Sequence, residues 1–210
     1  MRYAALFCDL GGVALTNGWD RRERAAAARR FDIDPAELEA RHAAIAGDFE
    51  CGRLPLGDYL KTVFLANPGS PRAHAVEAFM REQSQAYPGA LAVLERIGKA
   101  DPSLLLAALN NESAELNRHR IEAFQLRRYF QLFFSSCYLG VRKPDQRIYR
   151  LALAITQLAP AACLVIDDRQ ENLDAAARLG MPTLRIDTPG DLSGLQVRLE
   201  STALESTALL

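Results

Sequence analysis

Short runs of apolar residues alternate along the chain with stretches in which apolar residues recur at helical spacing. The runs predict buried strands, and the periodic stretches predict amphipathic helices. Strands are expected at 4–8, 104–109, 132–135, 163–166 and 183–186, with helices between the later ones at 90–99, 113–124, 145–157 and 172–179. Apolar strands that alternate with helices are typical of a parallel sheet covered on both faces. The pattern therefore predicts an α/β fold.

This alternation stops between residues 16 and 87, where no run resembles a buried strand. Helices are expected there at 21–31, 35–49, 56–66 and 72–86, separated by breaks rich in glycine and proline. The segment 16–87 thus has the pattern of a helical subdomain inserted after the first strand. The sheet domain is expected to comprise residues 1–15 and 88–210. The tail from residue 190 onward has only a weak helical pattern.

The first predicted strand ends in Asp9, which is followed closely by Gly11 and Gly12. In open α/β sheets, ligands bind at the edge formed by the carboxyl ends of the strands. The two glycines allow a sharp turn and a close approach of a ligand or ion to the backbone. A simpler interpretation is that Asp9 only begins a turn, since aspartate and glycine are both common turn residues.

Two further strands end in polar residues, and a lysine precedes one helix. Asn110 and Asn111 follow the second strand, where their amides can donate to an anion or cap the next helix. Asp167 and Asp168 follow the fourth strand, where they repel each other unless a cation compensates them. A hard divalent ion would do so, although acidic residues also favour a helix N-terminus without any metal. Lys143 lies before the helix expected at 145–157.

The order and spacing of these groups resemble the haloacid dehalogenase superfamily, in the branch with a helical cap inserted after the first strand. The resemblance covers residues 3 to 188. It rests on DLGGV at 9–13, on GVRKPD at 140–145 followed by Ile148 and Tyr149, and on IDD at 166–168 followed by Asn172 and Gly180. The resemblance implies a Rossmann-like parallel sheet core with an inserted helical cap.

The same resemblance implies a chemistry and a role for each residue. Asp9 would be the nucleophile that forms an aspartyl-phosphate, and Lys143 would balance negative charge. Magnesium would be held by Asp9, the Gly11 carbonyl and Asp168, with Asp167 beside the ion or bonded to Lys143. The phosphoryl group would be bound by Asn110, Asn111, Gly11, Gly12 and Lys143.

The sequence departs from the family pattern at two positions. Phosphatases of the family usually carry a second aspartate two residues after the nucleophile, and here that residue is Gly11. Asn110 stands where the family places serine or threonine. General acid–base help is worth about 10²–10⁴-fold, so we expect its loss to matter least for good leaving groups, unless another residue supplies the proton.

Three functions remain open at this point. The first is a magnesium-dependent phosphatase that acts on a small phosphorylated metabolite. The second is a catalytically weak or silent binding protein, which the replacements at Gly11 and Asn110 favour. The third is a metal-independent 2-haloacid dehalogenase, which would not need the missing aspartate but would not explain the paired carboxylates at 167–168.

Composition limits the partners. The formal net charge is −1, so no global field attracts nucleic acid or an anionic membrane, and no membrane span is expected. The four cysteines form no CxxC pair and lack zinc-site spacing, which favours a reduced, cytoplasmic protein. A monomer or a homodimer is expected. The three histidines, His42, His74 and His119, are expected at the surface. Arg21, Arg22 and Arg53 are candidate anion contacts from the helical segment.

Overall fold

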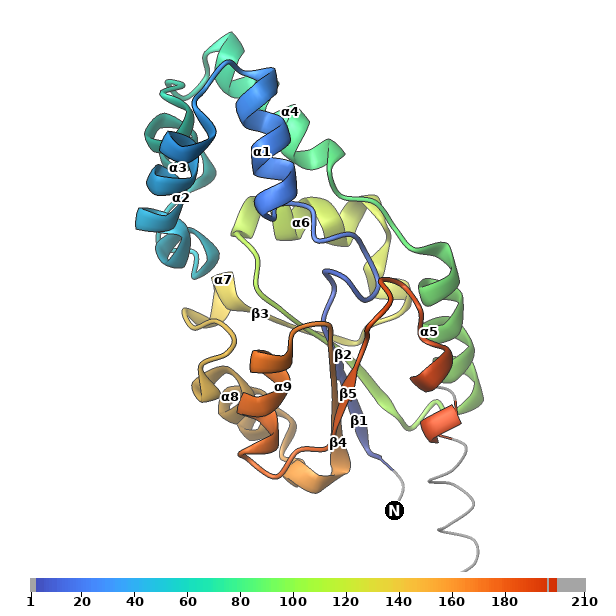
Figure 1. Ribbon diagram of the computed structural model, residues 1–210. Coiled ribbons are helices and arrows are strands. Elements are labelled where there is room, and N and C mark those ends of the chain that lie inside the picture. The colour runs from blue at the N-terminus through green and yellow to red at the C-terminus, as the bar shows by residue number, and fades with distance from the viewer. Residues whose placement is uncertain (1–2, 196, 200–210) are drawn as a thin grey trace, which may run out of the picture.

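The computed structural model describes residues 3–195 and 197–199 of the 210-residue chain. Its centre is a parallel five-stranded sheet with the strand order β3-β2-β1-β4-β5 (Figure 1). The strands are β1 (Ala5–Cys8), β2 (Leu105–Asn110), β3 (Leu132–Ser135), β4 (Cys163–Asp167) and β5 (Thr183–Arg185). The predicted α/β fold with a Rossmann-like sheet is therefore confirmed, and each predicted strand is present with ends that shift by one residue at most.

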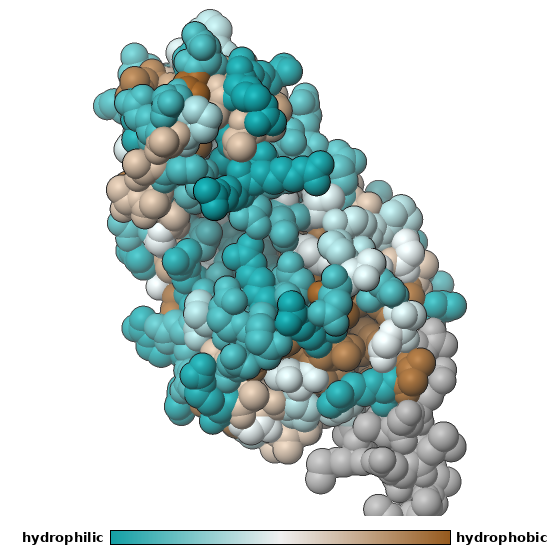
Figure 2. Space-filling view, viewed as in Figure 1, coloured by the Kyte–Doolittle hydropathy of each residue, from teal (hydrophilic) through white to brown (hydrophobic). Residues whose placement is uncertain are grey.

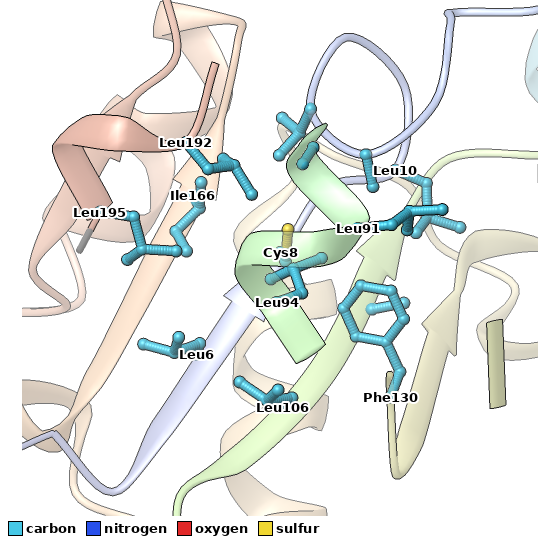
Figure 3. Close-up of a cluster of buried hydrophobic side chains, with 14 of the residues drawn as sticks. Leu6, Cys8, Leu10, Leu91, Leu94, Leu106, Phe130, Ile166, Leu192 and Leu195 are labelled. Carbon is cyan, nitrogen blue, oxygen red and sulfur yellow. The ribbon is translucent and has the colours of Figure 1, made fainter. Parts of the chain in front are cut away.

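The central strand β1 is buried on both faces. Its side chains alternate between two apolar clusters, as the period of a strand requires. Leu6 and Cys8 pack on one face with Leu94 of α5 (Pro88–Ala100), and Figure 3 shows this cluster. Ala5 and Phe7 pack on the other face. This double burial explains why β1 reads as a continuous apolar run.

Helices cover both faces of the sheet. The face of Leu6 is covered by α5 and by α6 (Ala114–Ala123), and the other face by α8 (Gln146–Thr156) and α9 (Gln170–Ala177). The short elements are η1 (Leu126–Arg128), α7 (Ser136–Leu139) and η2 (Pro160–Ala162). Leu192 and Leu195 are buried in the same cluster as Leu6. Residues 196 and 200–210 of the predicted tail lie outside the described residues.

Four helices stand between β1 and α5, within the predicted insertion at 16–87. They are α1 (Arg21–Arg30), α2 (Pro35–Glu50), α3 (Leu56–Phe64) and α4 (Pro71–Glu82), which we call the helical segment. They share a separate hydrophobic cluster, which also includes Leu116 of α6 and in which the rings of Phe49 and Tyr59 stack at 4.0 Å between centroids. Figure 1 shows the helical segment beyond the carboxyl edge of the sheet.

The last of these helices is shorter than predicted. The sequence predicts a helix through residue 86, but α4 ends at Glu82. The chain then pairs with the strand leaving β1: Thr16 donates its N–H to the Gln85 carbonyl at 2.8 Å, and Ala86 bridges to Leu15. These pairings hold the two connections to the helical segment together and end the helix.

Among the described residues, no helix combines the length and the apolar content that crossing a membrane requires.

Candidate active site

Asp9 directly follows β1 and lies at the carboxyl edge of the sheet. Its backbone N–H donates to the Ile166 carbonyl at 2.8 Å, so the pairing with β4 continues up to the carboxylate. The Oδ1 atom accepts a hydrogen bond from the Leu10 N–H at 2.8 Å. The residue is 9% exposed. Burial raises the pKa of this carboxyl to about 6, with Lys143 opposing the shift and Asp167 adding to it.

Lys143 forms a buried ion pair with two carboxylates. Its Nζ atom lies 2.6 Å from Asp167 Oδ2 and 3.0 Å from Asp9 Oδ1. Asn111 holds the Lys143 backbone, because its Nδ2 donates to the Lys143 carbonyl at 2.9 Å and its Oδ1 accepts from the Lys143 N–H at 2.8 Å. Burial alone would lower the pKa of the ammonium, but the charges of Asp167 and Asp9 outweigh it and raise the pKa. Lys143 therefore stays protonated and neutralises part of the negative charge.

Asp167 is well supplied with donors. It is 1% exposed, and besides Lys143 it accepts hydrogen bonds from Asn172 Nδ2 at 3.0 and 3.1 Å and from the Arg169 N–H at 2.9 Å. These donors compensate the cost of burying the charge. Of the two arrangements expected for Asp167, the structure contains the bond to Lys143.

Asp168 has fewer hydrogen-bond donors than Asp167. Among the described residues, none donates a hydrogen bond to its buried Oδ1 atom. Oxygen atoms of Asp9, Asp167 and Asp168 all lie within 4.8 Å of one another. Gly12 permits this approach, because it has φ +71° and a Cβ there would lie 2.3 Å from Asp168 Oδ2. A carboxylate cluster with an unpartnered oxygen, kept clear of side chains, fits a hard divalent ion such as Mg²⁺.

A cavity of about 490 Å³ lies between this cluster and the helical segment. The predicted site residues Asp9, Gly11, Asn111 and Lys143 line it. The surface between the helical segment and the sheet domain is mainly hydrophilic in Figure 2. Such a lining suits a polar, charged ligand.

Asn110 makes contacts of another kind. It is 1% exposed, its Nδ2 donates to Asn117 Oδ1 at 3.0 Å, and its Oδ1 accepts from Ser135 Oγ at 2.9 Å. Asn110 is not among the residues that line the cavity. The structure thus places its amide in a network between β2, β3 and α6, and its role as a phosphate ligand stays a prediction.

The cavity contains arginines that the sequence analysis did not single out. Arg24, Arg120, Arg142 and Arg169 line it, whereas Arg21 and Arg22 are exposed elsewhere on α1. Arg53 bonds to Asp48 at 2.8 Å and to the Gly140 carbonyl at 3.2 Å. No local pattern distinguishes the cavity arginines from the others, because chain-distant contacts position them.

Each of these four arginines has a carboxylate partner. The pairs are Arg24–Glu39 at 2.6 Å, Arg120–Glu112 at 3.2 Å, Arg142–Glu50 at 2.6 Å and Arg169–Asp20 at 2.9 Å. The last two pairs join the sheet domain to the helical segment. They hold the helical segment over the cavity.

The prediction that all three histidines lie at the surface is wrong for His42. It is 9% exposed, lines the cavity, and its Nδ1 atom lies 2.8 Å from the Tyr59 hydroxyl, which also accepts from Trp19 Nε1 at 2.8 Å. Burial and, to a smaller extent, the charge of Arg24 together lower the pKa of His42 to about 4. The charged neighbours of His42 in the sequence suggested an exposed side chain, but the surrounding aromatic residues bury it.

We predict that Asp9→Asn stabilises the metal-free protein. The pKa of Asp9 is raised by folding, so its ionised form opposes folding above about pH 6, and this cost is absent below about pH 4, where the carboxyl is neutral in both states. In chelator at pH 8, the substitution should raise the free energy of unfolding by about 1–3 kcal/mol, with no gain at pH 4. Urea denaturation measures both. The control Asp145→Asn, at an exposed cap of α8 whose pKa is lowered, should show no gain, and an Asp9→Asn protein no more stable than the wild type at pH 8 would contradict the prediction.

Comparison with known proteins agrees with this geometry. Residues 4–180 match the family model of the haloacid dehalogenase-like hydrolases. A phosphoserine phosphatase of Thermus thermophilus is 33% identical over 53% of this chain and 45% of its own length. An (S)-2-haloacid dehalogenase of Burkholderia cepacia is 28% identical over 52% of this chain and 47% of its own length. This chain thus spans under half of the length of either relative.

A solved structure extends the likeness of the fold. A HAD family enzyme of Bacteroides thetaiotaomicron, solved in complex with magnesium and inorganic phosphate, superposes with a TM-score of 0.77 over 92% of this chain and 98% of its own, at 18% identity. The sheet, the acidic cluster at its carboxyl edge and the match over residues 4–180 agree with one another, and the chain belongs to the haloacid dehalogenase-like hydrolases.

Proposed function

We propose that this protein is a magnesium-dependent phosphatase that acts on a small phosphorylated metabolite through an aspartyl-phosphate. One observation carries the proposal: Asp9 stands beside protonated Lys143 and within 4.8 Å of Asp168, whose Oδ1 atom has no partner among the described residues. Such a site combines a candidate nucleophile, a cation and a carboxylate oxygen that is available to a metal ion, beside a polar cavity.

The chemistry follows from the charges of a phosphate ester, which is anionic and repels nucleophiles. An Asp9 oxygen attacks phosphorus, the bond to the leaving oxygen breaks, and water then hydrolyses the aspartyl-phosphate. Lys143 offsets the negative charge on the phosphoryl oxygens. Mg²⁺, held by Asp9, the Gly11 carbonyl and Asp168, would supply further positive charge at the transferring group. Asp167 keeps Lys143 in place.

The helical segment completes this site. It covers the cavity and is joined to the sheet domain by the pairs Arg169–Asp20 and Arg142–Glu50. We propose that residues 16–87 act as a cap that excludes bulk water and selects the substrate. The phosphoserine phosphatase among the relatives and the magnesium and phosphate bound to the Bacteroides enzyme support a phosphorylated substrate.

The haloacid dehalogenase among the relatives supports a second candidate function. Displacement of a halide also uses a carboxylate nucleophile, and it needs no proton donor at Gly11. The unpartnered oxygen of Asp168 and the clearance at Gly12 favour the phosphatase, because a metal-independent reaction has no use for them.

We expect phosphate release from p-nitrophenyl phosphate and from a panel of small phosphate esters, and this release should require Mg²⁺. Asp9→Asn should lower it by at least about 10³-fold, since the amide is a poor nucleophile. Asp58→Asn, on the exposed side of α3, is the matched control and should retain wild-type rates. Halide release from 2-chloropropionate without metal, with no phosphate release, would establish the dehalogenase instead. A folded protein that binds Mg²⁺ but releases neither product would favour the binding protein.

We further predict that Gly12→Ala weakens magnesium binding. A Cβ at this position would lie 2.3 Å from Asp168 Oδ2 on a backbone with φ +71°, so the carboxylate must move. Isothermal titration should show an affinity for Mg²⁺ lower by about tenfold or more, in the range that misplaced ligands or their supports cost. The control is Gly89→Ala in α5, where nothing lies within 4 Å of the added carbon. Equal affinities in the two variants would remove Asp168 from the metal site.

A further inference from the structure

The proposed reaction needs a proton for the leaving group, and Gly11 cannot supply it. Asn17 fills the neighbouring space, since its Oδ1 atom lies 2.7 Å from where a Cβ of Gly11 would stand. An amide is neither an effective acid nor an effective base near neutral pH, so Asn17 does not replace the missing acid. Another titratable group in the same cavity must do so if poor leaving groups are to be cleaved.

Glu112 is the buried carboxyl that shares the cavity with Asp9. The other acidic side chains that line it are more exposed: Asp20, Glu39, Glu50 and Glu171. Glu112 is 7% exposed and follows Asn111 at the end of β2. Because Asn111 is bonded to the backbone of Lys143, Glu112 is anchored next to the cluster that holds the nucleophile.

Arg120 links Glu112 to the segment beside Gly11, and Glu112 and Gly11 line the same cavity. Its Oε2 atom accepts from Arg120 at 3.2 Å. Arg120 in turn donates to the Thr16 carbonyl, and its guanidinium lies 3.0 Å from where a Cβ of Gly18 would stand. Thr16 and Gly18 flank Asn17, the residue that fills the space beside Gly11. Glu112 is thus held between the Lys143 cluster and the segment that borders Gly11.

The surroundings of Glu112 allow its carboxyl to gain or lose a proton near neutral pH. Burial raises the pKa of this carboxyl to about 7, Arg120 from α6 and the Ser113 N–H oppose the shift, and Glu50 from α2 and Asp9 add to it. On the α7 side it faces Cys137, whose own pKa is raised by burial and by the charge of Glu112. A group with a pKa near the working pH is an effective acid in one step and an effective base in the next.

We propose that Glu112 is the general acid and base of this site, in place of the carboxyl that Gly11 lacks; the assignment rests on the proposed phosphatase function. As Asp9 bonds to phosphorus, the bond to the leaving oxygen breaks and Glu112 gives that oxygen its proton, so an alcohol departs. Water then attacks phosphorus, Glu112 takes a proton from it, and the bond between phosphorus and Asp9 breaks. Phosphate leaves, and both carboxyls return to their first state.

The test compares the wild type, Glu112→Gln and the double variant Gly11→Asp/Glu112→Gln on p-nitrophenyl phosphate, phenyl phosphate and an alkyl phosphate, all with Mg²⁺. In the wild type, kcat/KM should depend weakly on the pKa of the leaving group. In Glu112→Gln it should fall by about 10²–10⁴-fold for the alkyl ester and far less for p-nitrophenyl phosphate. Gly11→Asp should restore the alkyl activity, since Gly11 has no positive φ and the Asn17 amide can rotate away.

A pH profile gives a second readout. Because the acid must be protonated, kcat/KM of the wild type should fall as the pH rises through about 7, and this limb should vanish in Glu112→Gln. Arg120→Met keeps the acid but removes the charge that opposes its protonation, so the limb should move to higher pH. This variant keeps the test decisive if Glu112→Gln, which leaves Arg120 unpaired, does not fold. The control is Glu122→Gln, at an exposed position on α6, the helix that carries Arg120, and it should match the wild type.

The outcomes separate the two proposals. An active wild type whose Glu112→Gln variant loses all substrates equally, without rescue by Gly11→Asp, would make the Glu112–Arg120 pair structural and overturn the assignment. An active Glu112→Gln variant with an unchanged pH profile would overturn it as well. A folded wild type that binds Mg²⁺ and cleaves none of the three esters would overturn the phosphatase function, and the role of Glu112 with it.

Discussion

The buried lysine between two carboxylates is the interaction on which the site depends. Lys143 contacts Asp9 and Asp167 at 3.0 and 2.6 Å, and without it two negative charges would face each other at the edge of the sheet. Loss of Lys143 would leave both carboxylates without their cation, a change that typically costs about 3–5 kcal/mol for a buried ion pair. The arrangement is tolerated because Asp167 has further donors and Asn111 fixes the lysine backbone. The remaining negative charge is what makes the site receptive to a cation.

The strand order delivers these groups to one place. β1 lies between β2 and β4, so the chain segments that leave these three strands diverge from a common edge. In open sheets such a switch in direction creates a crevice for ligands. Here Asp9 follows β1, Asn111 and Glu112 follow β2, and Asp167 and Asp168 stand at the end of β4. The helical segment begins at Arg21, after the loop that follows Asp9, and its polar residues Arg24, Glu39 and Glu50 line the cavity at this edge of the sheet.

Much of this could be predicted from the sequence, because the decisive signals are local. Two apolar runs each predict a buried strand, and each is followed at once by a charged residue, Asp9 or Asp167. Both signals lie within a few neighbouring residues. The parallel sheet then brings the strand ends together without further information. The predicted metal and phosphate ligands remain predictions. A strand end does not determine what its side chain contacts, and the Asn110 amide is bonded to Asn117 and Ser135.

Features that depend on contacts between residues far apart in the chain could not be predicted from the sequence. His42 lies in a charged stretch, yet the Tyr59 hydroxyl and its aromatic surroundings bury it. No local pattern in the sequence indicated Glu112, because only its burial in the folded chain raises the pKa of its carboxyl, and Arg120 opposes that shift. A signal was available in the missing carboxylate at Gly11, which implies that a proton donor must come from elsewhere in the chain.

The claim that Asp9 is the nucleophile is tested most directly by trapping its covalent intermediate. Hydroxylamine converts an acyl phosphate to a hydroxamate, so protein incubated with p-nitrophenyl phosphate, Mg²⁺ and hydroxylamine can be digested and mapped by mass spectrometry. The account predicts a hydroxamate at Asp9 that forms only when substrate and metal are both present. A hydroxamate at another carboxyl, or sustained phosphate release that leaves Asp9 unmodified, would contradict it.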